Sequence, residues 1–399
     1  MTDQAQTPPR ILSAVTVSDS VIFFYGMPRF FRERGMDVAI ATSTGPELER
    51  IIREESPIVF EVEMAREPRP LQDLASLFKV LKTLLSYRPH ILNAGTPKAG
   101  FLYILAGWLL RVQIRIYHLR GLRHESLTGF AERLQIAIEK ITGRMATHVV
   151  CETESLRELA LEQGLFAQEK CHVLGPGSSG VELVHYDPDH WSQDARTKMR
   201  TRLGIPSQAR VIGFVGRLVP RKGIEDLIMA WKKSLRDAYP DTVLLLVGPF
   251  EDAQPVSKDI KRTMMKDPRI IAVGKVDDVA AHLAVMDVFT LPAHWEGFGN
   301  VVVEAAAMGL PVVTTTGTGT RDAAKHGFNA LLTDPKDIHQ LSCALSQYLD
   351  DPNLRAQHGE NGIIWAKRFD RQQILQHLYM FYSKMLNKRL HGAPRTNSE

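Results

Sequence analysis

Two glutamates eight positions apart carry the strongest chemical signal in the sequence. They are Glu296 and Glu304, and they lie in the segment 295–304, WEGFGNVVVE. Gly297 and Gly299 free the backbone, so that N–H groups at the start of the following helix can point at an anion. Glu304 lies among valines and alanines, where a lone carboxylate is expected to have a partner. It can accept two hydrogen bonds from the hydroxyls of a ribose. The alternative, a loop charge and a solvated helix residue, fits these apolar surroundings poorly.

A basic turn earlier in the chain could hold phosphate. The segment 213–223, GFVGRLVPRKG, predicts a buried strand that ends in glycine and a helix that opens after a lysine. Gly216 lets a phosphate approach the backbone. Arg217 and Lys222 would supply fixed positive charge to a diphosphate and stabilise the negative charge that grows on it as a leaving group. An ordinary strand-to-helix turn with two solvated cations explains these residues equally well.

The first half of the chain offers weaker candidates. Gly26 closes a loop, 18–26, after the first predicted strand and allows a close backbone approach. Lys98 opens a helix and could reach a phosphate, although a solvated lysine is an equal alternative. His118 stands at a strand end, where a local hydrogen bond is a better interpretation than catalysis.

Short β-type runs alternate with helical patterns and predict an α/β protein whose two doubly wound sheets are parallel. Strands are predicted at 11–17, 37–41, 58–62, 90–94, 114–117, 148–151, 211–215, 242–247, 270–273, 288–291 and 311–315. The rhythm pauses at GPGSSG, residues 175–180, where turns are favoured. The predicted parts are an N-terminal domain over 1–180, a linker over 181–206, a C-terminal domain over 207–370 and a helix over 371–390 that packs back toward the N-terminal domain.

The composition excludes several classes of protein. The 399 residues suit two domains, with 44% hydrophobic and 24% charged residues. A formal net charge of +4 does not predict binding to nucleic acid. The three cysteines, Cys151, Cys171 and Cys343, are far apart, which argues against a disulfide framework or a structural zinc site and for a reducing compartment. Neither first βα turn shows G-x-G-x-x-G, so nicotinamide binding is unsupported.

No integral membrane segment is expected. The first ten residues are polar, and the longest apolar run, 99–110, has about half of the ~20 residues that span a bilayer. A buried core helix explains that run better than an interfacial one. The arginines could attract an anionic leaflet, or they could form ordinary surface. They are Arg29, Arg32, Arg34, Arg111 and Arg115.

With these motifs in this order, the chain resembles the family 4 glycosyltransferases of the GT-B fold. Their signature is E-x7-E with glycines between, preceded by a G-R…K-G turn. The segments LLLVGP and GKVDD lie between the two motifs, and TPKAG and RGLR in the first half resemble the branch that builds capsules, O-antigens and protein glycans. These four segments are 244–249, 274–278, 96–100 and 120–123.

The resemblance implies two Rossmann-like domains facing a central cleft, and a retaining, metal-independent hexosyltransferase without a cofactor. The implied donor is a nucleotide sugar, with UDP the commonest carrier in this branch. The implied acceptor is a polyprenyl-diphosphate-linked saccharide. The enzyme would be cytoplasmic and peripheral at the inner membrane of a bacterium.

The resemblance also assigns roles to residues. Arg217 and Lys222 would bind the diphosphate, Glu304 the ribose and Glu296 the transferred sugar. The implied donor site comprises Gly216, Arg217, Lys222, Gly248, Lys275, Val276, Glu296, Gly297, Phe298, Gly299, Asn300, Val301 and Glu304. Gly26, Lys98 and His118 would lie on the acceptor side. Arg120 would join Glu296, Arg217 and Lys222 in catalysis, at a place where many members carry histidine.

Two other functions remain open at this stage. A nucleotide-sugar epimerase or hydrolase of the same fold would share the diphosphate site, but it should carry an acidic and histidine cluster at the sugar, and no clear one is visible. A non-catalytic subunit of a glycan-assembly complex would be free to lose Glu296, Glu304, Arg217 and Lys222, all of which are present.

Overall fold

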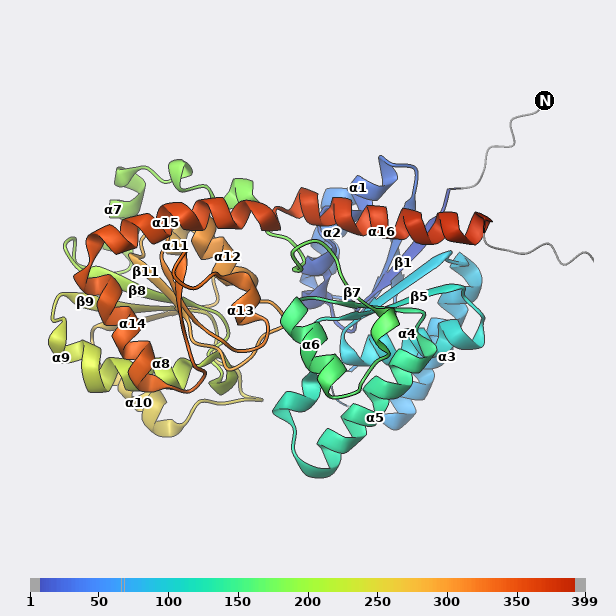
Figure 1. Cartoon of the computed structure of the whole chain (residues 1–399), viewed down its shortest axis with the longest axis horizontal. Helices are drawn as coiled ribbons and strands as arrows, with labels where there is room; N and C mark the ends of the chain where they lie inside the picture. Colours follow the sequence, from blue (N-terminus) through green and yellow to red (C-terminus); the bar gives the residue numbers. More distant parts are fainter. Residues whose placement is uncertain (1–7, 66, 68, 392–399) are drawn as a thin grey trace, which may run out of the picture. The chain divides into compact units, whose positions relative to one another are not determined.

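The computed structural model describes residues 8–65, 67 and 69–391 (Figure 1). The chain divides into two compact units. The first unit is Met1–Ser179 together with Gln372–Glu399, and the second is Gly180–Arg371. Each unit is built around a parallel sheet of its own, so the two are described separately.

The first unit contains a seven-stranded parallel sheet in the order β3-β2-β1-β4-β5-β6-β7. The strands are β1 (Arg10–Ala14), β2 (Asp37–Thr42), β3 (Ile58–Glu61), β4 (Ile91–Gly95), β5 (Ile114–Leu119), β6 (His148–Cys151) and β7 (Cys171–Val173). Six of them follow the predicted runs, but the first ends three residues early, and the 3-10 helix η1 (Ser18–Phe24) comes after it. The edge strand β7, of three residues, was not predicted.

Helices cover both faces of this sheet, as the continuous apolar character of its strands requires. They are α1 (Met27–Arg32), α2 (Pro46–Glu55), α3 (Pro70–Tyr87), α4 (Pro97–Leu109), α5 (Gly129–Met145), α6 (Glu154–Glu162) and α16 (Arg371–His391). Leu12 of β1 belongs to a core cluster with residues of α3, α4 and α6. Its neighbour Ile11 belongs to a cluster with residues of α1, α2 and α16, including Tyr382. The last helix of the chain is therefore part of the first unit's core.

The second unit contains a six-stranded parallel sheet in the order β10-β9-β8-β11-β12-β13. The strands are β8 (Arg210–Val215), β9 (Thr242–Val247), β10 (Ile270–Gly274), β11 (Val288–Leu291), β12 (Val312–Thr315) and β13 (Ala330–Thr333). The helices are α7 (Gln193–Arg202), α8 (Ile224–Ala230), α9 (Arg236–Ala238), α10 (Lys258–Lys266), α11 (Val279–Leu283), α12 (Asn300–Ala307), α13 (Thr320–Ala323), α14 (Ile338–Asp350) and α15 (Pro352–Ala366). Again the short edge strand, β13, was not predicted.

The segment expected as a linker, 181–206, differs from that expectation. It contains the 3-10 helix η4 (Leu183–Tyr186) and α7, and it lies within the second unit. Ser192 caps α7 by accepting a hydrogen bond from the Ala195 N–H at 3.2 Å. Arg196 and Arg200 then bond to carbonyls at the end of α11, including Ala284 O at 3.1 Å. These contacts attach the segment to the second unit's core.

Both sheets reverse their strand order at one point, between β1 and β4 and between β8 and β11. Loops that leave neighbouring strands in opposite directions open a crevice at such a point, which is where open α/β sheets bind ligands. In the first unit this point is held by Thr16 and Thr96, whose hydroxyls are 2.7 Å apart. In the second unit it holds the motifs that the sequence singled out.

Across the described residues, no helix combines the length and the apolar character needed to cross a bilayer.

Two glycines with nearly the same backbone conformation allow a test of close packing in the second unit. Gly223 has φ 71° and a Cβ there would lie 1.8 Å from Pro292 O, whereas Gly327 has φ 69° and open space around it. Gly327→Ala should lower the free energy of unfolding by about 1 kcal/mol, the cost of a left-handed conformation. Gly223→Ala should lower it by about 2 kcal/mol more, because the backbone must also shift. Urea unfolding of both variants measures this, and equal losses would contradict it.

Candidate active site

An ion pair lies at the strand-order reversal of the second unit. Lys222 ends the 3-10 helix η6 (Pro220–Lys222), which follows β8, and Glu296 lies in the loop after β11. The Lys222 Nζ is 2.6 Å from Glu296 Oε1, and both side chains are largely buried, with 14% and 11% exposed. The Arg221 guanidinium lies 3.6 Å from the same oxygen. Two motifs 74 positions apart therefore meet at one carboxylate.

A second glycine loop, which the sequence analysis did not single out, supports Glu296. The Glu296 N–H donates to Thr318 O at 2.9 Å. Gly319 has φ 79°, and a Cβ there would lie 2.3 Å from Glu296 O. At Gly317 a Cβ would lie 2.3 Å from His294 O. The run TGTGT after the strand at 312–315 was the available signal, since alternating glycines let two loop backbones come into contact.

His294 attaches the same loop to the beginning of α8. Its backbone N–H donates to Arg221 O at 2.8 Å, and its ring Nε2 is 2.6 Å from Asp226 Oδ2. The loop that carries Glu296 is thus bonded on one side to the Lys222 turn and on the other to the Gly317–Gly319 loop. Because these bonds are in place within the unit, Glu296 is positioned by the fold itself.

The helix α12 begins directly after this loop. Gly299 is its N-cap, with φ 86°, and the first helical residue is Asn300. Glu304 lies one turn further on and is largely buried. Burial raises the pKa of Glu304 to about 7, although the Tyr186 hydroxyl bonds to it and the charges of Arg371 and Lys222 act to lower it. Tyr186 belongs to η4, in the segment expected as a linker, and sequence reasoning missed it.

Two glycines bring the ends of β8 and β9 together beside the Lys222 turn. Gly248 has φ 139°, and a Cβ there would lie 2.0 Å from Gly216 O. The Gly248 N–H donates to Gly274 O at 2.8 Å. A side chain at 248 would therefore collide with the backbone, and with glycine at both 216 and 248 this edge of the sheet stays open to an approaching group.

Other predicted donor residues lie apart from the ion pair. Arg217 pairs with Glu251, and its side chain is 41% exposed. Both basic residues were expected to lie at the Glu296 segment, but only Lys222 contacts it. The Phe298 side chain is buried against Phe369, with ring centroids 5.0 Å apart, which leaves only its backbone for a ligand. Lys275 is exposed, and Val276 is partly buried against the core.

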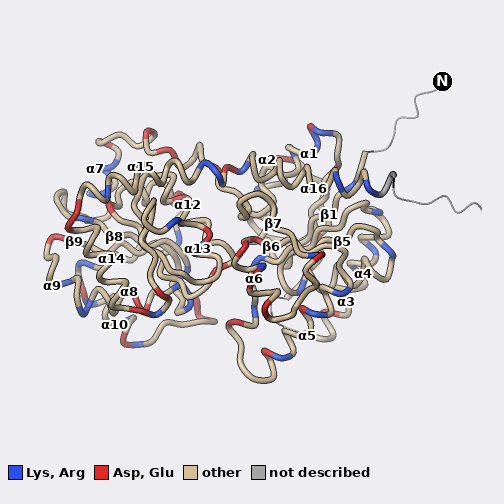
Figure 2. Tube along the Cα trace, viewed as in Figure 1, with Lys and Arg blue, Asp and Glu red and all other residues tan. Residues whose placement is uncertain are grey.

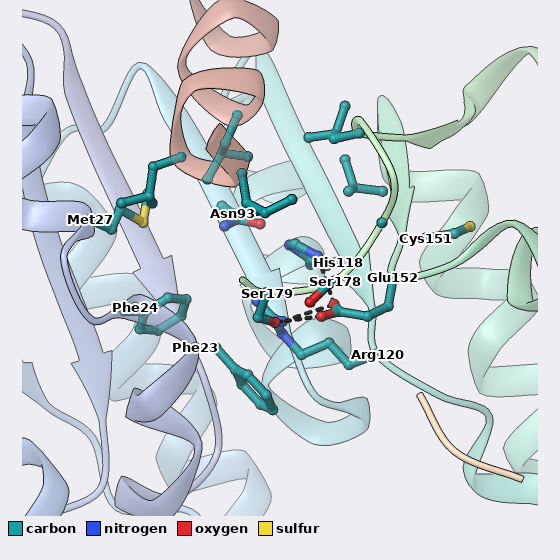
Figure 3. Close-up of a pocket in the computed structure, with 16 residues that line it drawn as sticks. Phe23, Phe24, Met27, Asn93, His118, Arg120, Cys151, Glu152, Ser178 and Ser179 are labelled. Carbon is teal, nitrogen blue, oxygen red and sulfur yellow. Dashed lines mark hydrogen bonds and ion pairs between the residues drawn. The ribbon is translucent and has the colours of Figure 1, made fainter. Parts of the chain in front are cut away.

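The first unit holds a buried charge cluster at the ends of β5 and β6 (Figure 3). Arg120 donates to Glu152 Oε2 at 2.9 Å and to Ser179 Oγ at 2.6 Å. His118 Nε2 is 3.2 Å from the same Glu152 oxygen, and Ser179 donates to the other one. The arginine also lies over the Phe23 ring, 4.1 Å from its centroid.

The three ionisable groups of this cluster depend on one another. Burial acts to raise the pKa of Glu152, but the charge of Arg120 and the bonds from His118 and Ser179 outweigh it and lower the pKa to about 2. Burial, followed by the charge of Arg120, lowers the pKa of His118. The cluster therefore contains an ionised pair, Arg120 and Glu152, beside a neutral histidine.

A cavity of about 40 Å³ adjoins the cluster (Figure 3). This space suits a few water molecules. Asn93 and His118 line it, and Asn93 Oδ1 and His118 Nδ1 have no hydrogen-bond partner in the described part of the chain. Sequence reasoning identified His118 and Arg120 and missed Glu152 and Ser179. The signal for Glu152 was a carboxylate directly after the buried strand at 148–151.

The two remaining acceptor-side candidates are already engaged. The Gly26 N–H donates to Glu55 Oε1 at 2.7 Å, so a carboxylate of α2 occupies the place of an anion at the start of α1. Lys98 Nζ is 2.7 Å from Asp73 Oδ1 and also donates to Glu67 O. Lys98 is therefore bound within the unit and not a freely solvated lysine, and its contact with an acceptor stays a prediction.

No three or more His, Cys, Asp or Glu side chains gather in an arrangement fit for a metal ion in the described ranges.

The chain matches two protein families. Residues 195–365 match the glycosyl transferases group 1, and residues 26–177 match the glycosyl transferase 4-like domain. It is 32% identical over 381 residues to the capsular polysaccharide biosynthesis glycosyltransferase CapM of Staphylococcus aureus, covering 95% of this chain and 98% of CapM. The chain belongs to the family 4 (group 1) glycosyltransferases, a retaining family with the GT-B fold.

Other relatives agree with this assignment. The UDP-Gal:alpha-D-GlcNAc-diphosphoundecaprenol alpha-1,3-galactosyltransferase of Escherichia coli is 26% identical over 298 residues, covering 74% of this chain and 76% of that enzyme. The crystal structure of Anabaena HepE in complex with UDP-glucose superposes with a TM-score of 0.78 at 22% identity, covering 94% of this chain and 99% of HepE. The structure of WaaG, a glycosyltransferase of lipopolysaccharide biosynthesis, gives a TM-score of 0.71 at 18% identity, covering 92% and 97%. Both structures confirm the GT-B fold.

The Glu152 cluster predicts a stability that depends on pH. Glu152→Gln should lower the free energy of unfolding by about 3 kcal/mol at pH 7, because it leaves the Arg120 charge buried without a counter-ion. The native pKa of about 2 lies below the ordinary 4.5, so the stabilisation is complete above pH 4.5 and is lost as the pH falls toward 2. Urea unfolding of the wild type and of Glu152→Gln across this range should show that the difference between their free energies of unfolding decreases as the pH falls. A difference that stays constant would contradict the charge argument.

Proposed function

We propose that this chain is a hexosyltransferase that moves a sugar, with retention of configuration, from a UDP-sugar to a polyprenyl-diphosphate-linked saccharide in the synthesis of a bacterial surface glycan. An N-acetylhexosamine or a related sugar is the proposed group transferred. The donor would bind at the strand-order reversal of the second unit. The reaction would need no resident cofactor and no metal.

One observation carries the proposal. Lys222 pairs with Glu296 in the loop before α12, and Glu304 lies one turn into that helix, where the charge of Lys222 still acts on it. A diphosphate there would meet the Lys222 ammonium and the backbone N–H groups after Gly297, both of which favour negative charge. Glu304 lies a turn below, where its carboxylate could accept hydrogen bonds from a ribose.

The relatives support the choice of donor and acceptor. HepE was crystallised with UDP and glucose and with UDP-glucose, and the E. coli relative is named for a UDP-linked galactose and a diphosphoundecaprenol acceptor. CapM is named for capsular polysaccharide biosynthesis. A lipid-linked acceptor would place the enzyme at the cytoplasmic face of the inner membrane.

The residues suggest how the chain would promote the reaction. As the bond between sugar and diphosphate breaks, negative charge grows on the phosphate, and a fixed cation stabilises that state more than the ground state. Glu296 holds Lys222 in place within the unit and would also contact the sugar. Arg120, which the resemblance assigns to catalysis, is held in the first unit by Glu152 and Ser179, and its role stays a prediction.

Product analysis separates this proposal from its two rivals. Nucleotide sugars are incubated with and without a polyprenyl-diphosphate saccharide, and glycolipid, free sugar and epimerised donor are measured. Transfer to lipid with an unchanged anomeric configuration is the expected outcome. Epimerised or hydrolysed donor, equal with and without acceptor, would make the chain an epimerase or hydrolase. Binding of donor without any turnover would make it a non-catalytic subunit.

Lys222→Ala should reduce kcat by about 10²–10³-fold and change KM little, because the charge matters most as the phosphate leaves. Steady-state kinetics with the donor and acceptor from the product screen measure both. Lys232→Ala, at an exposed lysine of the same unit, is the matched control and should behave as the wild type. Equal effects of the two substitutions would contradict the role of Lys222.

Glu304 should make donor affinity depend on pH. With a pKa of about 7, the carboxylate is largely protonated at pH 6, so the nucleotide sugar should bind about tenfold more weakly there than at pH 8. Isothermal titration calorimetry measures the affinity at both pH values. The nucleotide sugar is used rather than the free nucleotide, because it has no terminal phosphate that changes its charge in the same pH range. Glu304→Gln should bind weakly at both pH values and lose this dependence. If Glu304→Gln keeps the dependence, another group is responsible.

A further inference from the structure

Large apolar side chains are exposed on the outer side of three neighbouring helices in the first unit. We name them the α3–α5 patch, comprising Leu71, Leu74, Phe78 and Leu85 of α3, Trp108 and Leu109 at the end of α4, and Phe130, Leu134 and Ile141 of α5. The exposure is high, at 87% for Leu71, 81% for Phe130 and 65% for Phe78. Single exposed apolar residues are ordinary, but a group of this size marks an interaction surface.

The spacing shows that the patch is a property of whole helix faces. The α3 members stand at steps of three, four and seven residues, and the α5 members at steps of four and seven, so each set lies along one side of its helix. The opposite side of α3 contributes Val80 and Leu84 to the core. The helix α3 therefore has two apolar sides. The core buries one of them and leaves the other exposed.

The three helices form one continuous layer. α3 packs against α4, and α4 packs against α5 (Figure 1). All three lie on the side of the sheet where residues of α3 and α4 form the core with Leu12 and Ala14. Because α4 contacts both other helices, the exposed sides belong to one layer, to which the last turn of α4 adds Trp108 and Leu109.

Both signs of charge occur along these helices (Figure 2), but the exposed cations outnumber the carboxylates. Exposed cations on these helices and just after them are Lys79, Lys82, Arg88, Arg111, Arg133 and Arg144. The carboxylates on the same three helices are Asp73, Glu132 and Glu139. Asp73 is paired with Lys98, and Glu139 is buried against the Tyr117 hydroxyl at 2.8 Å. A partner that covers this surface must accept apolar side chains and carry negative charge.

We propose that the α3–α5 patch docks the enzyme on an anionic lipid surface. Phenylalanine, tryptophan and leucine side chains would enter the boundary between headgroups and acyl chains, and the surrounding lysines and arginines would contact anionic headgroups. A second copy of the chain is disfavoured, because a two-fold interface would bring the same cations face to face. This inference deepens the proposed function, in which the acceptor is lipid-linked.

Three of the arginines noted in the sequence, unlike Arg111, are less suited to this role. Arg29 and Arg32 donate to the carbonyls of Glu54 and Glu55 at 2.9 and 3.1 Å. Arg115 donates to Met145 O at 2.8 Å and is partly buried. These guanidinium groups are bound within the unit, where they stabilise helix ends.

Vesicle flotation of the full chain tests the proposal. The wild type should float with phosphatidylcholine vesicles that contain phosphatidylglycerol, more than with phosphatidylcholine alone, and less at raised salt. Phe78→Ser/Phe130→Ser should reduce binding by roughly tenfold or more. Lys79→Glu/Arg133→Glu should remove the preference for anionic lipid, since each cation near such a surface contributes roughly fivefold in binding. The matched control is Met265→Ser/Ile364→Ser, at side chains of the second unit with 78% and 58% exposure, and it should bind like the wild type.

Several outcomes would overturn the inference. The wild type could show no preference for anionic vesicles, or the phenylalanine variant could bind as well as the control. Light scattering could also reveal a wild-type dimer that the phenylalanine variant converts to a monomer, which would assign the patch to a second copy.

Turnover on a detergent-solubilised acceptor separates this inference from the proposed function. The phenylalanine variant should keep its turnover and lose flotation. Turnover without vesicle binding by the wild type would reject the docking surface alone, and vesicle binding without turnover on any acceptor would reject the proposed function alone.

Discussion

The ion pair between Lys222 and Glu296 is the interaction on which the candidate site depends. Its two members come from loops that leave β8 and β11, the strands between which the second sheet reverses its order. Neither charge could remain so little exposed without the other, because an unpaired buried charge is strongly destabilising. The surrounding bonds all position one or the other partner: His294 joins the Glu296 loop to α8, and the Gly317–Gly319 loop supports its backbone. A lysine positioned in this way is available to a diphosphate without first having to be ordered.

The first unit uses a similar arrangement at a different pair of strands. Glu152 follows β6, Arg120 follows β5, and both are buried at the carboxyl edge of the sheet. Ser179 and His118 complete the bonding of the carboxylate. In each unit a carboxylate at a strand end thus fixes a basic side chain from a neighbouring loop. Glu304 differs, because burial outweighs the charges of Arg371 and Lys222, so its pKa of about 7 lets it change charge near neutral pH.

The sequence predicted most of the fold, for a reason visible in particular elements. Eleven strands gave clear apolar runs because a parallel strand covered by helices is buried on both faces. β7 and β13, edge strands of three and four residues, were not singled out, although the equally short edge strand β3 was. The segment 181–206 was expected as a linker because it follows the turn-forming run GPGSSG and has an irregular pattern. Arg196 and Arg200 nevertheless attach it to the second unit through carbonyls that no sequence pattern reveals.

For the site, residue type and spacing alone determined which groups could do chemistry: the E-x7-E segment, the Gly216–Gly223 turn, and the pair His118 and Arg120. Only the tertiary structure decided which of them have partners. In the structure Lys222 pairs with Glu296, Arg217 with Glu251 and Lys98 with Asp73. Two residues that the sequence analysis did not name also have partners far away in the chain: Glu152 contacts Arg120, and Tyr186 contacts Glu304. The physical reason is that apolar periodicity is a local property that each segment expresses by itself. The pairing of charges depends instead on distances between segments, and these exist only once the sheets have formed.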